Sequence, residues 1–511
     1  MDDLPGVDPV EGGKPDDGLP EGEPAPRLKQ INRKQFLLRP VDVERLVPED
    51  HEVRAIWEFS GHLDLTGYYQ RIHAVEGKAG CTAFDPRLLV CIWIYAYSKG
   101  IGSAREISRL CEYDPAYQWL TGMEPVNYHT LSDFRSSHKD SLDRLFVEVL
   151  GIMSAEGLIT LERVMQDGTK VKALADGGSF RREDRIREHL LAAEEQVRQA
   201  PDEEANPRAR KAQERAVQEK KERMEHALLE LEKIRKTKSG EGKKEARASM
   251  TDPDARIMKQ SDGGYAPAYN VQLSMDAAAG VIIGVGVSQR LDDSQELMPA
   301  IERIEENVGK IPGQVVADGS YTSWENVIAM KGAGTDFIGA ITDRATQMAG
   351  SFKQRGVDAA FYPEHFAYDE VTDAYTCPEG KILRHNGRNN YIGGTNHLYR
   401  ARKGDCASCP HKEQCCPGKM NMRTVVRRVN DPVVVSFMEK MKTEEAKKIY
   451  KQRGAIAEFP IAWIKEKIGL RQFRLRGLLK VGMEALWACL TYNIQQWIRL
   501  CWRPSLAKGR V

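Results

Sequence analysis

The chain has 511 residues, enough for two to four domains with a sizeable buried core. Its 75 Lys and Arg against 74 Asp and Glu give a net charge of +1, which argues weakly against a uniformly basic nucleic-acid-binding protein. The sequence has no run of 18 or more apolar residues and no basic-then-apolar N-terminus, so it predicts neither a membrane span nor secretion. We therefore expect a cytoplasmic protein whose ten cysteines are reduced.

The two ends of the chain differ in charge. The first 26 residues hold eight Asp and Glu, one Lys, six Pro and five Gly. Such a segment cannot bury enough apolar surface to offset its ordering entropy, so residues 1–30 are predicted to be a disordered acidic tail. Residues 463–480, by contrast, carry six Lys and Arg and one Glu.

Residues 31–157 are predicted to form a helical N-terminal domain. Asp85-Pro86 is a suitable cap and first turn of one helix, and Ser103 begins a capping box for a second. Further short helices are expected after Asp114-Pro115 and after Thr130. Short helices joined by tight turns suit a helix-turn-helix DNA reader, and they suit a generic helical domain equally well.

From residue 161 the pattern changes to strands. The first is Leu161–Asp167, residues 269–275 and 281–287 form a hairpin, and a helix near 297–304 precedes a strand that ends at Asp318. A helix and another strand follow. The order β-β-β-α-β-α-β, with a helix still to come, is typical of a ribonuclease H-like fold. The predicted class is therefore α/β, with a catalytic core made of residues 158–180, 262–344 and 431–500.

The first insertion into this core, residues 181–261, is predicted to be a charged helical hairpin. Residues 181–247 contain 19 Lys and Arg and 16 Asp and Glu. A coiled-coil-like apolar seam runs through Val217, Met224, Leu228 and Leu231. The mixed charges favour a solvated surface over a nucleic-acid groove.

The second insertion, residues 345–430, is rich in cysteine. A Cys-x-x-Cys knuckle with further cysteines suits a tetrahedral, structural zinc ion. Cys416 or His411 could replace one of the ligands, and the irregular spacing leaves ordinary reduced thiols as the alternative. The four candidate zinc ligands are Cys377, Cys406, Cys409 and Cys415.

Two apolar runs of the predicted core end in Asp-Gly, at Asp167 and Asp318, and a late helix carries Glu458 among cations. Phosphodiester cleavage needs charge stabilised on the attacking and the leaving oxygen, which two divalent ions held by carboxylates provide. Asp167 would bridge both ions, and the glycines after the aspartates would leave room for a phosphate. Taken singly, an Asp-Gly is most often a turn start, and a glutamate among cations is most often a solvated pair.

The late helix reads Tyr450-x-x-Arg453-x-x-x-x-Glu458-x-x-x-x-x-x-Lys465. With these residues the chain resembles a bacterial insertion-sequence transposase of the DDE type, with an InsH-like N-terminal domain and the Tyr-Arg-Glu-Lys signature. The similarity covers most of residues 30–500. Besides the cysteine insertion it rests on residues 84–89, 165–173, 269–272, 316–321 and 469–477.

The resemblance implies that Asp167, Asp318 and Glu458 are catalytic and hold two Mg²⁺ or Mn²⁺ ions, and that Tyr450, Arg453 and Lys465 grip DNA phosphates. It also implies a nucleoid-associated protein that binds terminal inverted repeats and target DNA, acts as a homodimer or larger assembly, and cleaves and transfers strands. Four residues separate Arg453 from Glu458 where the family has three. Either the helix starts after Arg453 or the role of this arginine is shifted, and the alternative third carboxylates are Glu466 and Glu445.

The basic segment near the C-terminus is expected to contact DNA phosphates, which makes affinity fall steeply with salt. The alternative is a cationic helix end that is stabilised by the helix dipole. The segment comprises Lys465, Lys467, Arg471, Arg474, Arg476 and Lys480. Two other functions use the same scaffold: a domesticated nuclease that cuts DNA without joining it, and a non-catalytic DNA-binding regulator.

Overall fold

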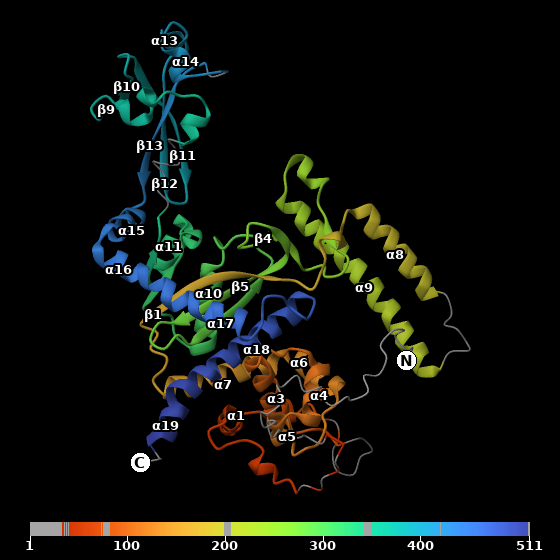
Figure 1. The fold of residues 1–511 in the computed structure, drawn as a ribbon. Helices are drawn as coiled ribbons and strands as arrows, with labels where there is room; N and C mark the ends of the chain where they lie inside the picture. Colours follow the sequence, from red (N-terminus) through yellow and green to blue (C-terminus); the bar gives the residue numbers. More distant parts are fainter. Residues whose placement is uncertain are drawn as a thin grey trace, which may run out of the picture.

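The computed structural model describes residues 33–508, except residues 35, 37, 39, 73, 75–81, 199–205, 342–349 and 419–420. The protein is a mixed α/β structure in which helices surround a central sheet and two projections extend from this body (Figure 1). The predicted acidic tail, residues 1–30, lies outside the described residues. Within the described ranges no helix has both the length and the apolar character required to cross a bilayer.

The N-terminal region is helical, as predicted. Asp85 caps the helix that starts at Pro86, Ser103 caps the next one, and Asp114 caps a third, each by accepting a backbone N–H. The helix expected after Thr130 begins earlier, at Tyr128, because Asn127 provides its cap. The elements are η1 (Val43–Arg45), α1 (Glu52–Ser60), α2 (Thr66–Tyr69), α3 (Pro86–Ser98), α4 (Ala104–Tyr113), α5 (Pro115–Thr121), α6 (Tyr128–Ser137) and α7 (Lys139–Ala155).

The central sheet has six strands, with the neighbour order β4-β5-β1-β7-β8 and β6 also paired to β5. Strands β7 and β8 run parallel to β1, whereas β5 runs antiparallel to it. The predicted hairpin is present as β5 and β6. The strands are β1 (Arg163–Lys172), β4 (Arg256–Lys259), β5 (Tyr265–Asp276), β6 (Ile282–Ser288), β7 (Gln314–Ala317) and β8 (Asp336–Gly339).

The prediction that the first strand ends at Asp167 is wrong. Strand β1 continues for five residues beyond it, to Lys172, because the long strand β5 keeps pairing with it through Ala268. It is β7 that ends here: its last residue, Ala317, is aligned with Gln166 of β1. Asp167 therefore lies inside a strand, next to the point where its parallel neighbour stops.

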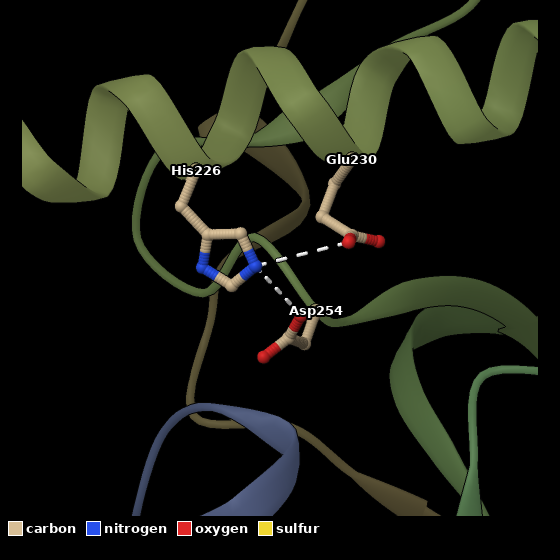
Figure 2. A group of neighbouring side chains, drawn as sticks. All are labelled: His226, Glu230 and Asp254. Carbon is tan, nitrogen blue, oxygen red and sulfur yellow. Dashed lines mark ion pairs between the residues drawn. The ribbon is translucent and has the colours of Figure 1, made fainter.

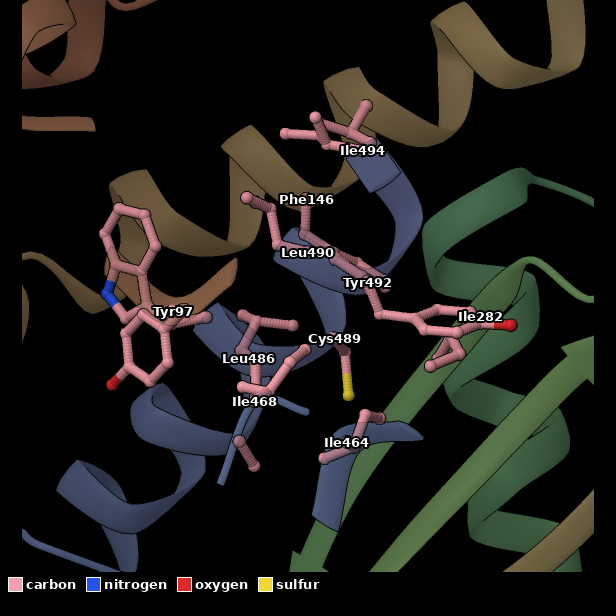
Figure 3. Close-up of a cluster of buried hydrophobic side chains, with 14 of the residues drawn as sticks. Tyr97, Phe146, Ile282, Ile464, Ile468, Leu486, Cys489, Leu490, Tyr492 and Ile494 are labelled. Carbon is pink, nitrogen blue, oxygen red and sulfur yellow. The ribbon is translucent and has the colours of Figure 1, made fainter. Parts of the chain in front are cut away.

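Helices pack on both sides of this sheet. The longest buried one, α18, touches β6 of the sheet and α3 and α7 of the N-terminal region, so one continuous core joins the two regions (Figure 3). Most residues of α18 are buried, and its sequence is accordingly apolar apart from a few buried polar residues such as Glu484 and Asn493. The other helices of this body are η4 (Gly319–Tyr321), α10 (Leu297–Val308), α11 (Trp324–Gly332), α15 (Pro432–Lys442), α16 (Glu444–Arg453), η7 (Gly454–Glu458), α17 (Phe459–Glu466), α18 (Leu478–Trp497), η8 (Ile498–Trp502) and α19 (Arg503–Lys508).

The first insertion is a pair of long helices, as predicted (Figure 1). It has a small apolar core of its own, in which Met224 and Leu231 of the predicted seam are buried. The predicted boundary at residue 261 is too late, because β4 already belongs to the central sheet. The elements are η2 (Gly177–Ser179), β2 (Phe180–Arg181), α8 (Glu183–Arg198), α9 (Pro207–Thr237), η3 (Gly240–Lys243) and β3 (Ala248–Ser249).

The second insertion is an arm built on a five-stranded antiparallel sheet, which projects from the body beside α11 and α15 (Figure 1). Two short helices at its far end carry most of the cysteines. The elements of the arm are η5 (Ala359–Phe361), η6 (Pro363–His365), β9 (Ala367–Asp369), β10 (Ala374–Thr376), β11 (Ile382–Tyr391), β12 (Gly394–Arg400), α13 (Lys403–Ala407), α14 (Lys412–Cys415) and β13 (Thr424–Asn430).

Candidate active site

Asp167 is a nearly buried carboxylate at the centre of the sheet, with 9% of its surface exposed. Its Oδ1 accepts the backbone N–H of Gly168 at 2.9 Å, and its Oδ2 accepts Nη1 of Arg453 at 2.9 Å. Burial raises the pKa of Asp167 to about 6, although Arg453 and the Gly168 N–H oppose the rise. The nearby carboxylates of Asp318 and Asp293 raise the same pKa further.

Asp318 follows directly after β7 and caps the turn η4. Its Oδ1 accepts the backbone N–H of Ser320 at 2.8 Å and the Ser320 hydroxyl at 2.5 Å. Because Ala317 is aligned with Gln166, the parallel register places Asp318 beside Asp167, with an estimated Cα separation of about 5 Å. The two strand-associated aspartates thus lie together, and Asp318 also plays the turn-capping role that an Asp-Gly most often has.

Glu458 is the last residue of η7, a single π-helical turn between α16 and α17. A π turn contains one residue more than an α turn, so it absorbs one extra residue without ending the helix. The extra residue between Arg453 and Glu458 lies in this turn. The sequence offered two explanations for the extra residue, and the first, that the helix starts after Arg453, is wrong. Helix α16 ends on Arg453, and η7 continues it without a break.

Arg453 forms an ion pair with Asp167 and interacts electrostatically with Asp318 and Glu458. Its guanidinium pairs with Asp167, and η7 packs against β1. Burial by itself would lower the pKa of Arg453, but the charges of Asp167, Asp318 and Glu458 raise it above the ordinary arginine value. Glu458 itself is exposed, on the side of η7 that solvent reaches. The alternative third carboxylates lie elsewhere: Glu466 pairs with Arg471, and Glu445 is exposed at the start of α16.

Asp293 is a fourth acidic residue of this site, which the sequence reasoning missed. Its Oδ1 accepts Nδ2 of Asn270 at 2.6 Å and Nε2 of Gln272 at 2.7 Å. Lys170 lies 3.4 Å from the same oxygen, and the Ser320 hydroxyl lies 3.4 Å from the other. Ser320 therefore stands between Asp293 and Asp318.

A buried polar ladder on β5 holds Asp293 in place. Asn270, Gln272 and Ser274 alternate along the strand and are each at most 2% exposed. Gln272 also accepts from Gln166 of β1 and from the Tyr321 hydroxyl. The alternation Asn-x-Gln-x-Ser becomes a signal only once β5 is known to be a central strand with both faces covered, because its polar residues must then face a polar site rather than solvent.

Gly168 is required for packing rather than for the approach of a phosphate. A Cβ at this position would lie 2.6 Å from Nε2 of Gln272 and 2.9 Å from both Oδ1 of Asp293 and the Tyr321 hydroxyl. The expectation that this glycine leaves open room for DNA is wrong, since the polar ladder fills the space. At Gly319, a Cβ would meet Ala340 at ordinary contact distance.

The predicted DNA-contacting residues surround this site unequally. Tyr450 is partly buried, with Arg453 5.9 Å from its ring centroid, and burial lowers the pKa of the half-buried Lys465. The other cations of the basic segment are exposed, but backbone hydrogen bonds fix the position of the segment. The carbonyl of Lys172 in β1 accepts the N–H of Phe473, and the carboxylate of buried Glu484 accepts the N–H of Arg474. The exposed cations are Lys467, Arg471, Arg474, Arg476 and Lys480.

Asp167, Asp318 and Glu458 do not all approach one another within 4.8 Å; in the described part of the chain only His226, Glu230 and Asp254 do so (Figure 2). A two-ion site does not require such closeness. With ions about 4 Å apart and metal–oxygen bonds of about 2.1 Å, ligands of different ions can lie up to about 8 Å apart.

The group around His226 docks α9 onto the body. Figure 2 shows the imidazole of His226 paired with Asp254 and Glu230. The distance to Asp254 is 3.1 Å, and Glu230 also pairs with Arg256 and Lys233. Asp254 accepts the N–H of Leu478 at the start of α18. These carboxylates are already neutralised by cations and N–H donors, which disfavours a divalent ion among them.

All four predicted zinc ligands line one cavity of about 30 Å³ at the end of the arm, and Cys416 joins them. The cavity is about the size of a single water molecule or ion. Backbone N–H groups donate to two of the sulfurs, Lys381 to Cys377 at 3.3 Å and Arg423 to Cys406 at 3.4 Å. Such bonds favour a thiolate, and Cys416 lies 3.9 Å from Cys415, whose pKa it lowers by hydrogen bonding.

Two segments of the chain match models of known protein families. Residues 41–137 match a transposase domain (DUF772), and residues 376–498 match the transposase DDE domain, which includes Glu458. No protein in the curated set matches the chain. Asp167 and Asp318 lie between the two matched segments, in the sheet that brings them beside the helix of Glu458. These two matches support a DDE-type insertion-sequence transposase.

Proposed function

We propose that this protein is the transposase of its own insertion sequence, which binds the terminal inverted repeats and catalyses metal-dependent DNA cleavage and strand transfer. The observation that carries the proposal is geometric: Arg453 pairs with Asp167, the parallel register sets Asp318 beside Asp167, and the turn that ends at Glu458 packs against β1. The order of the central sheet is compatible with the ribonuclease H-like core that we propose. Three carboxylates close to one arginine, with Glu458 exposed to solvent, suit phosphodiester chemistry.

The donor set fits two hard divalent ions. Asp167, Asp318 and Glu458 supply carboxylate oxygens, which Mg²⁺ and Mn²⁺ prefer. Bound there, the ions would activate the attacking hydroxyl or water and stabilise the leaving oxygen. Arg453 keeps Asp167 oriented through its 2.9 Å contact and presents its remaining N–H groups toward a DNA phosphate. Ser320 orients Asp318 in the same way.

Asp293 acts as a positioning residue in this proposal, because its oxygens hold the amides of β5 and face Ser320. Asp293→Asn should raise the Mg²⁺ concentration needed for half-maximal cleavage about tenfold and leave DNA binding unchanged. A purely structural role would instead lower the free energy of unfolding with no change in the Mg²⁺ requirement.

The remaining parts fit the same reaction. The helical region up to residue 157 would bind the element ends, and a homodimer or larger assembly would hold two ends together. The cavity of cysteines at the end of the arm would take a structural zinc ion, because four cysteines line it and backbone N–H groups donate to two of their sulfurs. In the described residues no three of these sulfurs lie within 4.8 Å of one another, so binding requires the sulfurs to move closer together.

The test is cleavage of a duplex that carries the element end, taken from the genomic sequence that flanks the coding frame. Asp167→Asn, Asp318→Asn and Glu458→Gln should each abolish nicking with Mg²⁺ and retain end binding. A domesticated nuclease would nick but not join the freed 3′-hydroxyl to a target plasmid. A non-catalytic regulator would bind and not nick at all, and either result would overturn the proposal.

A further inference from the structure

The two insertions use their charged residues in opposite ways. On the α8–α9 hairpin the cations are matched locally: Arg185 pairs with Glu188, Arg187 with Glu183, and Arg182 with Glu245. The arm differs in pairing rather than in composition. Residues 359–430 contain eleven Lys and Arg against seven Asp and Glu. In the described part of the arm no Lys or Arg forms an ion pair, and the one pair there joins His411 to Glu379.

Three arginines of the arm lie on one face of its sheet. Arg384 of β11 lies directly opposite Arg400 of β12, and Arg428 of β13 lies opposite Asn396. Residues 396 and 400 are four apart on β12, so they point to the same face of the sheet. The arginines aligned with them on the neighbouring strands share that face, so Arg384, Arg400 and Arg428 lie on one side. The opposite face is the one that packs the small apolar core of the arm, through Leu383 and Tyr399.

These three arginines are exposed, and within the described residues the side chain of none of them has an ion-pair or hydrogen-bond partner. Like charges placed directly opposite each other destabilise a sheet, so Arg384 beside Arg400 costs folding stability. A cost that nothing else in the arm offsets is expected where the charges are needed for an anionic partner.

The position of the arm indicates which anion this is. Its basal turn touches the body at Trp324, the first residue of α11, where a Cβ on Gly393 would lie 2.6 Å from the indole. Trp324 follows Asp318 by six residues. Along β12, Asn396 and Arg400 lie two and six residues from Gly394, which corresponds to about 7 and 20 Å from this turn.

We propose that the open face of the arm, defined by Arg384, Arg400 and Arg428, binds the phosphates of duplex DNA that extends from the cleavage site. Measured along the strands, Arg428 lies about 13 Å from the Arg384–Arg400 pair, because it is aligned with Asn396, four residues before Arg400. This is close to the major-groove width of about 12 Å, so the two positions reach phosphates on both strands. The inference rests on the proposed function only in taking duplex DNA as the substrate.

The test uses the full-length protein and a fluorescent 40-base-pair duplex, with affinity measured by anisotropy from 50 to 300 mM KCl. The triple substitution Arg384→Gln, Arg400→Gln and Arg428→Gln should weaken binding at least tenfold at 100 mM KCl. It should also reduce the slope of log affinity against log salt by about 2.7, since each phosphate contact contributes about 0.9. The same three positions changed to Lys should keep the slope.

The matched control is Arg182→Gln, Arg185→Gln and Arg187→Gln on the hairpin, which removes the same charge from cations that have acidic partners. Its affinity should stay within about twofold of the unsubstituted protein. If the triple arm variant does not fold, Arg428→Gln alone should still lower the slope by about 0.9.

An arm variant with unchanged affinity and salt slope overturns the inference and leaves the proposed function standing, and this is also the result if the face binds a protein. Equal losses in the arm variant and the hairpin control overturn it as well, because they show only the effect of net charge. An unsubstituted protein that binds no duplex at any salt concentration overturns the proposed function itself.

Discussion

The π turn η7 is predicted to bring the side chains of Arg453 and Glu458 onto the same face of the helix despite the extra residue between them. In an unbroken α-helix five residues turn the chain through about 500°, which would place these two side chains about 140° apart. A turn with i to i+5 hydrogen bonds advances by only about 80° per residue, so the two side chains end about 40° apart. Deleting one residue and restoring an α-helix gives about 400°, an offset of about 40°.

Deletion of Ala455, which is exposed within η7, should therefore leave Arg453 and Glu458 on one face. We expect nicking of the element end to remain within about fivefold of the unmodified protein, with the free energy of unfolding unchanged within about 1 kcal/mol. The matched control is insertion of one alanine after Ala455. Six residues of α-helix put the two side chains about 120° apart, so nicking should fall at least a hundredfold.

The measurement is the rate of nicking with Mg²⁺, together with end binding and thermal unfolding of both variants. A deletion variant as inactive as the insertion variant, while still folded and binding DNA, would refute the register argument. So would an insertion variant that cuts normally, because Glu458 would then not need to share a face with Arg453.

Three further predictions follow from the site and the arm. Gly168→Ala should lower the free energy of unfolding by about 1–3 kcal/mol in urea titrations, because the added Cβ would clash with the polar side chains on β5. The control is Gly151→Ala in a helix, where the added Cβ has no atom within 4 Å. This variant should raise the free energy of unfolding by about 0.5–1 kcal/mol. Burial raises the pKa of Asp167 to about 6, so below that pH protons compete with the metal ion for its carboxylate. Calorimetry should therefore show the affinity for Mg²⁺ falling about tenfold per pH unit below about pH 6. An affinity that stays constant between about pH 5 and 6 would contradict this. Elemental analysis should find one zinc per chain, lost in Cys406→Ser and kept in Cys91→Ser, whose thiol is buried in α3; zinc retained by Cys406→Ser would remove that ligand.

The sequence was sufficient to predict the convergence of Asp167 and Asp318. Each follows an apolar run, and two such runs in a parallel pair must place their following residues side by side. The structure adds that only β7 ends there. The continuation of β1 depends on its pairing with β5, a long-range contact that no local pattern around Asp167 reveals.

Glu458 could be chosen from its spacing to Lys465, but its relation to Arg453 could not. The extra residue leaves the sequence ambiguous, since a helix break and a π turn have the same local composition. The packing of η7 against β1 decides between them.

Asp293 could not be recognised from the sequence as a residue of the site, for a different reason. It stands in a polar loop between β6 and α10, where Asp is common and carries no distinctive neighbour. Its role depends on Asn270 and Gln272, which a period-two pattern assigns to the solvent face of a strand. Both faces of β5 are covered, so these amides turn toward the site instead.

The central claim is that divalent ions bind among Asp167, Asp318 and Glu458. Fe²⁺ in place of Mg²⁺, with ascorbate and peroxide, generates hydroxyl radicals that cut the polypeptide next to the bound ion. The account predicts breaks close to residues 167, 318 and 458, which disappear in Asp167→Asn. Breaks confined to the region of His226 and Asp254, with none at those three positions, would contradict it.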